Sequence, residues 1–232
     1  MQVAHIQALM VDLDGTMVDT MADFEAALNL ALADIDLPTV AREVVNIAVG
    51  KGSEHLVRTV LEHQLALPEV QASGVVCNST TVETYYEPAF QRYQHHYGWV
   101  NGQHAEVYAG VLDGLKAFQS RGLPMACLTN KPTAFAKDLL ARKGLEGFFS
   151  HVFGGDAFPR KKPDPMPLLA TCQALGTLPA HTLMLGDSQN DAQAARAAVC
   201  PVVLVTYGYN HGEPIRGVDC DGFIDSFTEL RW

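Results

Sequence analysis

Three short runs of consecutive apolar residues end abruptly in polar ones, at residues 8–11, 125–128 and 182–185. Short apolar runs without alternation are typical of strands that are buried on both faces of a parallel sheet. Around the second and third runs, apolar residues recur at helical spacing, so strands alternate with helices. The pattern predicts an α/β fold with a Rossmann-like, doubly wound parallel sheet.

A long helical stretch separates the first predicted strand from the second, which does not begin until about residue 124. Apolar residues at helical spacing predict a first helix over residues 21–36, and Thr39 is placed to cap a second one. Two further helices are predicted over residues 53–65 and 80–97. We therefore predict a small helical cap domain of four or five helices, inserted after the first strand.

The domain boundaries follow from this insertion. Residues 1–16 and 91–232 are predicted to form the α/β core domain, and residues 17–90 to form the helical cap. A cap inserted at this point would close over the carboxyl end of the first strand, where open α/β sheets bind their ligands. Closure would exclude water and add contacts to a bound small molecule.

Each of the three predicted strands delivers polar side chains at its carboxyl end, and a lysine precedes one of the later helices. Because these strand ends share one edge of a parallel sheet, the side chains are expected to converge. They are Asp12, Asp14, Thr129, Asn130, Lys162, Asp187 and Asp191.

The predicted cluster contains four carboxylates, which tolerate one another only with a divalent cation, a strong pKa shift or both. Mg²⁺ prefers oxygen ligands and retains water and substrate phosphate in its shell. Thr129 and Asn130 offer a hydroxyl and an amide to phosphate oxygens, and Lys162 offers a compact positive charge. These groups together indicate a phosphoryl-transfer site, with one acid as nucleophile and another moving the proton.

The four motifs, in this order, resemble those of the haloacid dehalogenase superfamily of phosphohydrolases over essentially the whole chain. They are Asp12-Leu13-Asp14-Gly15-Thr16, Thr129-Asn130, Lys162-Pro163 and Gly186-Asp187-Ser188 with Asp191. The resemblance implies a helical cap of the C1 type. It also implies that Asp12 is the nucleophile that becomes an aspartyl-phosphate. Asp14 would be the acid that protonates the leaving alcohol and then activates water.

The same resemblance implies the remaining roles in the site. Asp12, Asp187 and the backbone carbonyl of Asp14 would bind Mg²⁺, and Asp191 would support this shell and Lys162 from outside. The phosphoryl group would be bound by Thr129, Asn130 and Lys162.

Asp14 narrows the reaction, because dehalogenases and phosphonate-cleaving relatives lack this second acid. The string Thr206-Tyr207-Gly208-Tyr209-Asn210 resembles bacterial phosphoglycolate phosphatases in particular. The resemblance implies a Mg²⁺-dependent phosphatase that hydrolyses 2-phosphoglycolate to glycolate and phosphate. Two alternatives stay open: a related phosphatase that acts on a sugar phosphate or pyrophosphate, and a phospho-acceptor switch of the receiver type.

The turn Gly50-Lys51-Gly52 in the cap is the candidate for reading the leaving group. Its glycines allow close approach, and the helix that follows presents amide groups that favour an anion. Lys51 is placed to pair with a substrate carboxylate, although a solvated lysine in a turn explains the same residue equally well. The tyrosines at helical spacing over residues 85–97 indicate packing, and Lys161 is expected to face solvent.

Composition limits the partners and the compartment. With 232 residues, 48% of them hydrophobic, the chain can bury a sizeable core. A formal net charge of −10 argues against nucleic acid or an anionic membrane as the main partner. Five cysteines without a C-x-x-C pair indicate free thiols in a reducing compartment. We expect a cytoplasmic protein, a monomer or homodimer, whose partner is a small phosphorylated metabolite.

Overall fold

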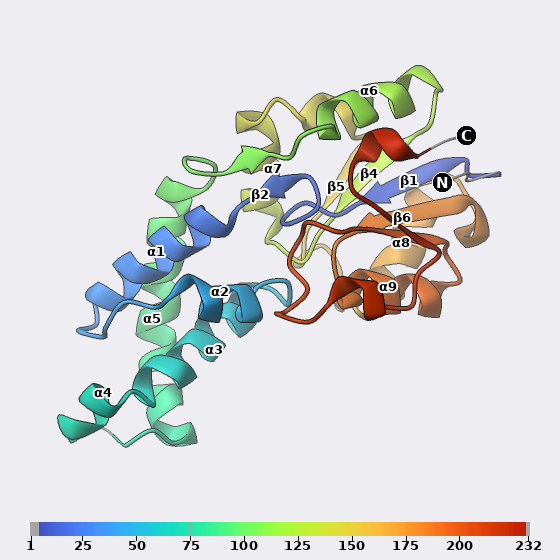
Figure 1. Ribbon diagram of the computed structural model, residues 1–232. Coiled ribbons are helices and arrows are strands. Elements are labelled where there is room, and N and C mark those ends of the chain that lie inside the picture. Colours follow the sequence, from blue (N-terminus) through green and yellow to red (C-terminus); the bar gives the residue numbers. More distant parts are fainter. Residues whose placement is uncertain (1–4, 75, 231–232) are drawn as a thin grey trace.

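A six-stranded parallel sheet forms the centre of the computed structural model, which describes residues 5–74 and 76–230 (Figure 1). The strand order is β5-β4-β1-β6-β7-β8. The bounds are β1 Ala8–Val11, β4 Met125–Leu128, β5 His151–Phe153, β6 Thr182–Gly186, β7 Val202–Val205 and β8 Gly222–Ile224. The predicted α/β fold is confirmed, and the three strands that were predicted to carry the polar groups, β4, β1 and β6, are neighbours in the sheet.

Helices cover both faces of this sheet (Figure 1). The side chains of Leu9 and Val11 pack in the cluster on the side of α6 (Val111–Ser120) and α7 (Thr133–Arg142). Met10 points the other way, into the cluster formed with α8 (Met166–Leu175) and α9 (Gln189–Ala198). Because successive side chains of a strand alternate between faces, both faces need apolar residues. This is why the strands read as continuous apolar runs.

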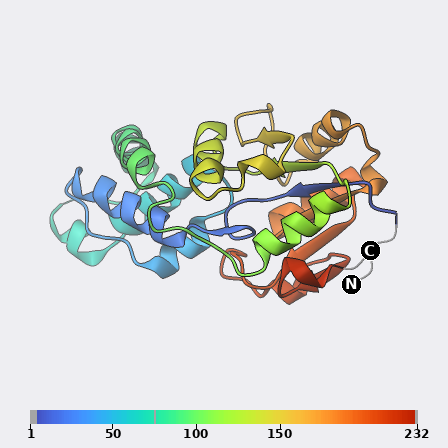
Figure 2. The same ribbon diagram turned by 90° about the horizontal axis from the view of Figure 1, so that it is seen from above.

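Over residues 17–74 and 76–100, the cap consists of five helices. They are grouped at one end of the molecule beside the sheet, as Figure 2 shows. Their bounds are α1 Met21–Ala33, α2 Arg42–Ala48, α3 Ser53–Leu65, α4 Pro68–Ala72 and α5 Ser79–Val100. Short 3₁₀ turns complete the structure at Glu146–Phe148, Pro179–His181, Ile215–Gly217 and Phe227–Glu229.

Three predicted boundaries in the cap differ from the structure. Helix α1 ends at Ala33, three residues early, because Asp36 has a positive φ of 57° that a helix does not accommodate. Thr39 does not cap α2, whose N-cap is Ala41. The predicted domain boundary at residue 90 falls within α5, which continues to Val100 because its apolar stripe does.

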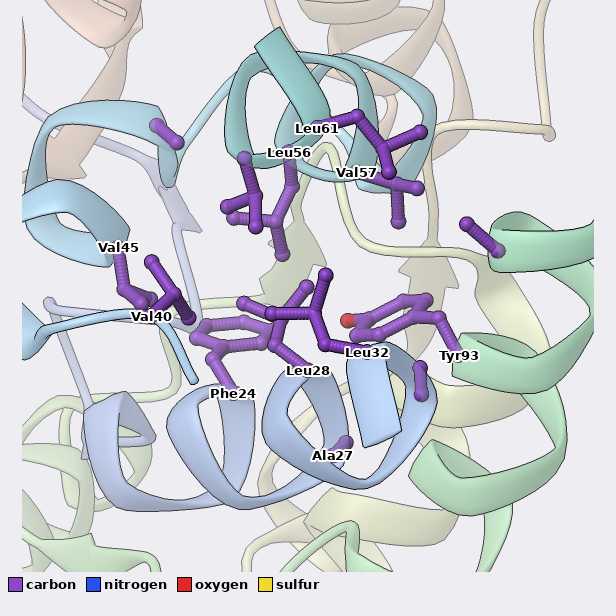
Figure 3. Packing of buried hydrophobic residues seen from close by; sticks show 14 of the residues in the cluster. Phe24, Ala27, Leu28, Leu32, Val40, Val45, Leu56, Val57, Leu61 and Tyr93 are labelled. Carbon is purple, nitrogen blue, oxygen red and sulfur yellow. The ribbon is translucent and has the colours of Figure 1, made fainter. Parts of the chain in front are cut away.

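The cap has its own hydrophobic core, separate from the two that flank the sheet. Figure 3 shows Phe24 and Leu28 of α1 facing Leu56 of α3, with Tyr93 of α5 alongside. Phe24 also stacks on Tyr97 with ring centroids 5.3 Å apart and the planes inclined by 10°. The tyrosines of α5 therefore pack, as predicted, and this packing fixes the position of the helix that faces the sheet edge.

Two chain segments connect the cap to the core, and they pair with each other. They are the two-residue strands β2 (Val18–Asp19) and β3 (Glu106–Val107), which run antiparallel. This pairing holds both connections side by side.

None of the helices in the described ranges is both long and apolar enough to cross a membrane.

Candidate active site

The carboxyl ends of β1, β4 and β6 open into a pocket between the sheet and the cap. From the core, Asp12, Asp14, Thr129, Asn130 and Asp187 line this pocket, as the sequence predicted for this edge. The cap contributes mostly apolar side chains, and a few further residues complete the lining: Phe24, Val49, Gly50, Gly52, Ser53, Leu56, Tyr93, Tyr97, Lys131, Ser188 and Tyr209.

A tight turn after β1 approaches the Asp187 side chain closely. Gly15 has a φ of 81°, and a Cβ added there would lie 2.1 Å from Asp187 Oδ2. Only glycine therefore fits between the β1 turn and the carboxylate at the end of β6. The segment after β1 thus lies against Asp187, and Asp12 is close to it, although the two segments are far apart in the chain.

Lys162 is buried at the centre of the carboxylates. Its Nζ lies 3.0 Å from Asp12 Oδ1 and 2.6 Å from Asp191 Oδ1, and it donates to the carbonyl of Leu128 at 2.9 Å. Burial lowers the pKa of Lys162, but the attraction of Asp12 and Asp191 more than offsets this and raises it. Lys162 is thus a permanent positive charge beside the candidate nucleophile.

Lys161 points the other way. Its Nζ pairs with Glu54 Oε2 of α3 at 2.7 Å, and both side chains are partly exposed. The adjacent lysines therefore have different tasks: Lys162 belongs to the site, and Lys161 forms a surface ion pair between core and cap. The expectation that Lys161 faces solvent holds in part, because its charge has a partner.

Asp191 organises the loop that carries Asp187. Its Oδ2 accepts hydrogen bonds from the Ser188 hydroxyl at 2.8 Å, the Ser188 amide at 3.2 Å and the Asp187 amide at 3.3 Å. Together with Ser188 it forms a capping box at the start of α9. Both oxygens are thereby engaged, one on Lys162 and one on this loop. Asp191 is therefore held in place from two sides, by Lys162 and by the start of α9.

Three carboxylates crowd together at this edge. One oxygen from each of Asp12, Asp187 and Asp191 lies within 4.8 Å of the others, and all three residues are buried. Burial raises the pKa of Asp12 to about 6, with Lys162 lowering it and Asp191 raising it further. Burial and the charges of Asp191 and Asp12 raise the pKa of Asp187 well above its usual range.

This donor set fits a hard divalent cation. Asp12 Oδ1 is buried without hydrogen-bond geometry to any described residue, although Lys162 Nζ is 3.0 Å away as an ion-pair partner. Unsatisfied, crowded carboxylate oxygens with raised pKa are relieved by a cation that prefers oxygen ligands. The residues at the ends of β1 and β6 could therefore hold Mg²⁺.

We expect Mg²⁺ to stabilise the folded protein more at pH 7.5 than at pH 5.5. A carboxyl group whose pKa is higher in the folded than in the unfolded protein destabilises the folded state when it is ionised. For Asp12 this loss of stability is absent below the unfolded pKa near 3.8 and fully present above the folded pKa of about 6. At pH 5.5 the buried carboxyl groups retain protons that Mg²⁺ must displace in order to bind. At pH 7.5 Mg²⁺ instead reduces the repulsion between ionised carboxylates. At saturation we expect a rise in the unfolding temperature of about 5 °C or more.

Thermal unfolding with and without Mg²⁺ at both pH values measures this effect, with EDTA as the reference. The variant Asp187→Asn is the control, because it removes one candidate ligand and one buried charge. It should unfold at a higher temperature than the wild type in EDTA at pH 7.5 and should lose the response to Mg²⁺. An equal Mg²⁺ effect at both pH values, or a full response in Asp187→Asn, would contradict the assignment.

Thr129 and Asn130 lie at the predicted edge, and the Asn130 side chain already has hydrogen-bond partners there. The Asn130 side chain bonds both the amide and the carbonyl of Lys162, at 3.0 and 2.8 Å. Its Nδ2 also donates to the carbonyl of Gly50 in the cap turn at 3.0 Å. The amide thus positions Lys162 and the cap turn. Its oxygen and nitrogen already have hydrogen-bond partners at the pocket. The Thr129 hydroxyl accepts from the Lys131 amide at 3.2 Å and so has its own proton to donate.

The cap turn reaches the pocket through its backbone. Gly50 and Gly52 line the pocket, and the Gly50 carbonyl accepts hydrogen bonds from Asn130 and Asn190, the latter at 3.1 Å. Gly50 has a φ of 104°, and a Cβ there would lie 2.9 Å from the His211 ring. Lys51 itself is exposed, and it is absent from the pocket lining that the described residues form.

Sequence reasoning gave Lys131 and Tyr209 no role in the site and gave Tyr97 only a role in packing, but all three line the pocket. Lys131 Nζ donates to Asp14 Oδ1 at 3.0 Å and to the hydroxyl of Tyr97. The Tyr209 amide donates to Asp187 Oδ2 at 2.6 Å, and its hydroxyl accepts from the Thr20 amide at 2.8 Å. Two features of the sequence pointed to these residues. Lys131 directly follows the candidate Asn130, and Tyr209 belongs to the string Tyr207-Gly208-Tyr209.

The same arrangement of motifs appears in known proteins. The profile of the haloacid dehalogenase-like hydrolases matches residues 6–198. The chain belongs to this family. The family is one of enzymes, so the receiver-type switch is no longer needed to explain the acidic pocket.

Curated relatives of this family member span nearly its full length. It is 40% identical over 225 residues to a phosphoglycolate phosphatase of Thiobacillus denitrificans, covering 97% of this chain and 93% of that one. The phosphoglycolate phosphatase of Salmonella typhimurium is 36% identical over 230 residues, covering 97% and 91%. A crystal structure described as a predicted phosphoglycolate phosphatase from Haemophilus somnus superposes with a TM-score of 0.88 at 30% identity, covering 98% and 97%.

Proposed function

We propose that this protein is a Mg²⁺-dependent phosphatase that hydrolyses 2-phosphoglycolate to glycolate and phosphate through an aspartyl-phosphate intermediate. The observation that carries the proposal is the pair Asp12 and Asp14 at the mouth of a pocket closed by a cap, with Lys162 3.0 Å from Asp12. The substrate rests on the relatives named phosphoglycolate phosphatase at 36–40% identity across 97% of the chain.

Asp12 is the group that attacks phosphorus. A carboxylate oxygen of Asp12 forms the new bond to phosphorus, in line with the ester oxygen that leaves. Lys162 compensates negative charge next to this carboxylate, and the Thr129 hydroxyl donates to a phosphoryl oxygen. Mg²⁺ held by Asp12, Asp187 and the Asp14 carbonyl would neutralise charge on the phosphoryl group, with Asp191 supporting Asp187 from behind.

Asp14 moves the proton in both halves of the reaction. In the first half, its protonated carboxyl gives the proton to the ester oxygen as the bond to phosphorus breaks, which releases glycolate. In the second half, the ionised carboxylate takes a proton from water, whose oxygen attacks the aspartyl-phosphate and releases phosphate. Asp14 then holds a proton again, and Asp12 is regenerated as the free carboxylate.

The cap residues keep bulk water away from this chemistry. Phe24, Leu56 and Tyr93 supply the apolar wall of the pocket opposite the carboxylates. A water-poor site strengthens each charge interaction and protects the intermediate from hydrolysis before glycolate has left. The turn Gly50-Lys51-Gly52 borders the pocket with its two glycines, whereas the exposed Lys51 lies outside the lining formed by the described residues.

A panel of phosphate esters tests the proposal by measuring phosphate release in the presence of Mg²⁺. It holds 2-phosphoglycolate, several sugar phosphates, pyrophosphate and an aryl phosphate. We expect kcat/KM for 2-phosphoglycolate to exceed that of every other compound by at least about tenfold, since one matched charge pair is worth that much. If the enzyme preferred a sugar phosphate or pyrophosphate, the proposed mechanism would stand and the proposed substrate would be wrong. Turnover that does not respond to EDTA would contradict the metal dependence.

A further inference from the structure

Lys131 is the only cationic side chain that lines the pocket, counted over the residues that the structure describes. It follows Asn130 at the end of β4 but reaches across toward the cap. Its side chain is only 2% exposed, so its charge is held inside the protein. Lysines are almost never so deeply buried unless their charge has a partner.

The side chain of Asp14 is the acidic partner of Lys131. The Nζ lies 3.0 Å from Asp14 Oδ1 and 3.3 Å from Oδ2. It also donates to the hydroxyl of Tyr97, and it lies 4.7 Å from the Tyr97 ring centroid and 4.9 Å from that of Phe24. Two cap helices and the core thus hold the ammonium group in one place.

The hydrogen-bonding capacity of Lys131 exceeds these contacts. An ammonium group has three N–H donors and no acceptor. One is directed to Asp14 and one to Tyr97, so a third remains for a ligand in the pocket. The Tyr93 hydroxyl is buried in the same lining with the Ser53 side chain beside it, but without hydrogen-bond geometry to a described residue. The third N–H of Lys131 and the hydroxyl of Tyr93 are therefore available to donate hydrogen bonds to an anion in the pocket.

The position of Lys131 matches the shape of a two-carbon acid ester. In 2-phosphoglycolate a single methylene separates the ester oxygen from the carboxylate. The group that reads the carboxylate must therefore lie directly beside the group that serves the ester oxygen, which is Asp14. Lys131 meets this condition at 3.0 Å. Lys51 is exposed on the turn and outside the lining.

We propose that Lys131, supported by Tyr97, is the specificity-determining residue that binds the carboxylate of the leaving group. The inference rests on the proposed function and adds to it the residue that distinguishes a phosphate ester with a carboxylate from one with a neutral group on the same two-carbon chain. Phe24 and Tyr97 exclude water from this contact, which makes the charge pair stronger than it would be in solvent.

The test compares two esters with the same two-carbon chain, 2-phosphoglycolate and 2-hydroxyethyl phosphate, in which a neutral CH₂OH replaces the carboxylate. The ratio of their kcat/KM values is measured for the wild type, Lys131→Met, Lys131→Arg and Lys51→Met. Removal of the partner of Asp14 slows both esters, and this effect cancels in the ratio. We expect Lys131→Met to lower the ratio about 10–100-fold, and Lys131→Arg to retain more of it. Lys51→Met should leave the ratio within about twofold of the wild type.

A second readout does not depend on turnover. In the Asp12→Asn background, titration calorimetry gives the Kd of each ester with and without Lys131→Met. The ratio of the two Kd values should change by the same factor as the kinetic ratio. If Lys131→Met does not fold, as judged by thermal unfolding, Lys131→Gln takes its place under the same expectation.

The outcomes separate this inference from the proposed function. A wild type that prefers 2-phosphoglycolate, with variants at Lys131 that retain the preference, overturns the role of Lys131 alone. Loss of the preference in Lys51→Met but not in Lys131→Met overturns it too and assigns the reading to the turn. A wild type without any preference for the carboxylate contradicts the proposed substrate, and the inference fails with it.

Discussion

Replacement of Asp12 by asparagine is expected to abolish turnover, with a loss of kcat of at least about 10⁴-fold. The amide has no negative oxygen to attack phosphorus, so no phosphoryl-enzyme can form. The fold should persist, because Asn has nearly the same volume and removes a charge whose pKa burial raises to about 6. Phosphate release from 2-phosphoglycolate and from an aryl phosphate measures the loss.

Asp113→Asn is the matched control for this substitution. Asp113 is exposed on α6 in the same core domain and does not line the pocket, so its change should leave kcat within about twofold. Acid quenching during turnover, followed by mass measurement, should find a phosphoryl adduct on the wild type and none on Asp12→Asn. Substantial turnover by Asp12→Asn, or an adduct on another residue, would refute Asp12 as the nucleophile.

Replacement of Lys162 by methionine is expected to damage both stability and activity. Asp191 and Asp12 would be left buried with Asp187 and without their shared cation. Breaking a buried pair by removing one partner costs about 3–5 kcal/mol of unfolding free energy. The loss of the charge next to the phosphoryl group should lower kcat by about 10²–10³-fold or more. Denaturant unfolding in EDTA and phosphate release measure the two effects.

The neighbouring Lys161→Met is the control, since it removes the same side chain from a partly exposed ion pair with Glu54. It should cost about 1 kcal/mol or less. The double variant Lys162→Met/Asp191→Asn distinguishes stability from catalysis, because it removes one of the stranded charges. It should regain part of the lost stability and none of the activity. Equal effects of the two lysine substitutions would contradict the central position of Lys162.

Local patterns in the sequence were enough to predict the α/β fold and the convergence of the core motifs. The reason is physical: β1, β4 and β6 are buried on both faces and so appear as uninterrupted apolar runs. Parallel strands end at one edge of the sheet, so the polar residues that follow them meet there. This convergence can be predicted without knowing any side-chain conformation. The cap was visible as a helical insertion, but its boundary at residue 90 lies inside α5.

The roles of individual side chains at this edge depended on tertiary contacts. The sequence pattern made Asn130 a phosphate ligand, whereas its amide holds Lys162 and Gly50 in place. It offered Lys51 as the cation nearest the leaving group, whereas Lys131 is the cation inside the pocket. Which lysine faces inward is decided by how the cap packs on the core.

The sequence by itself therefore determined the fold class and the convergence of the candidate acids at one edge of the sheet, because these follow from the period and the end points of secondary structure. Only the tertiary structure decided which cation lines the pocket among the described residues. The partners of Lys131 are Asp14 from the loop after β1 and Tyr97 from α5, and no local pattern connects these segments. They meet because the cap packs on the core, where Tyr97 of α5 contacts Phe135 of α7 with ring centroids 5.1 Å apart and Asn130 donates to the Gly50 carbonyl.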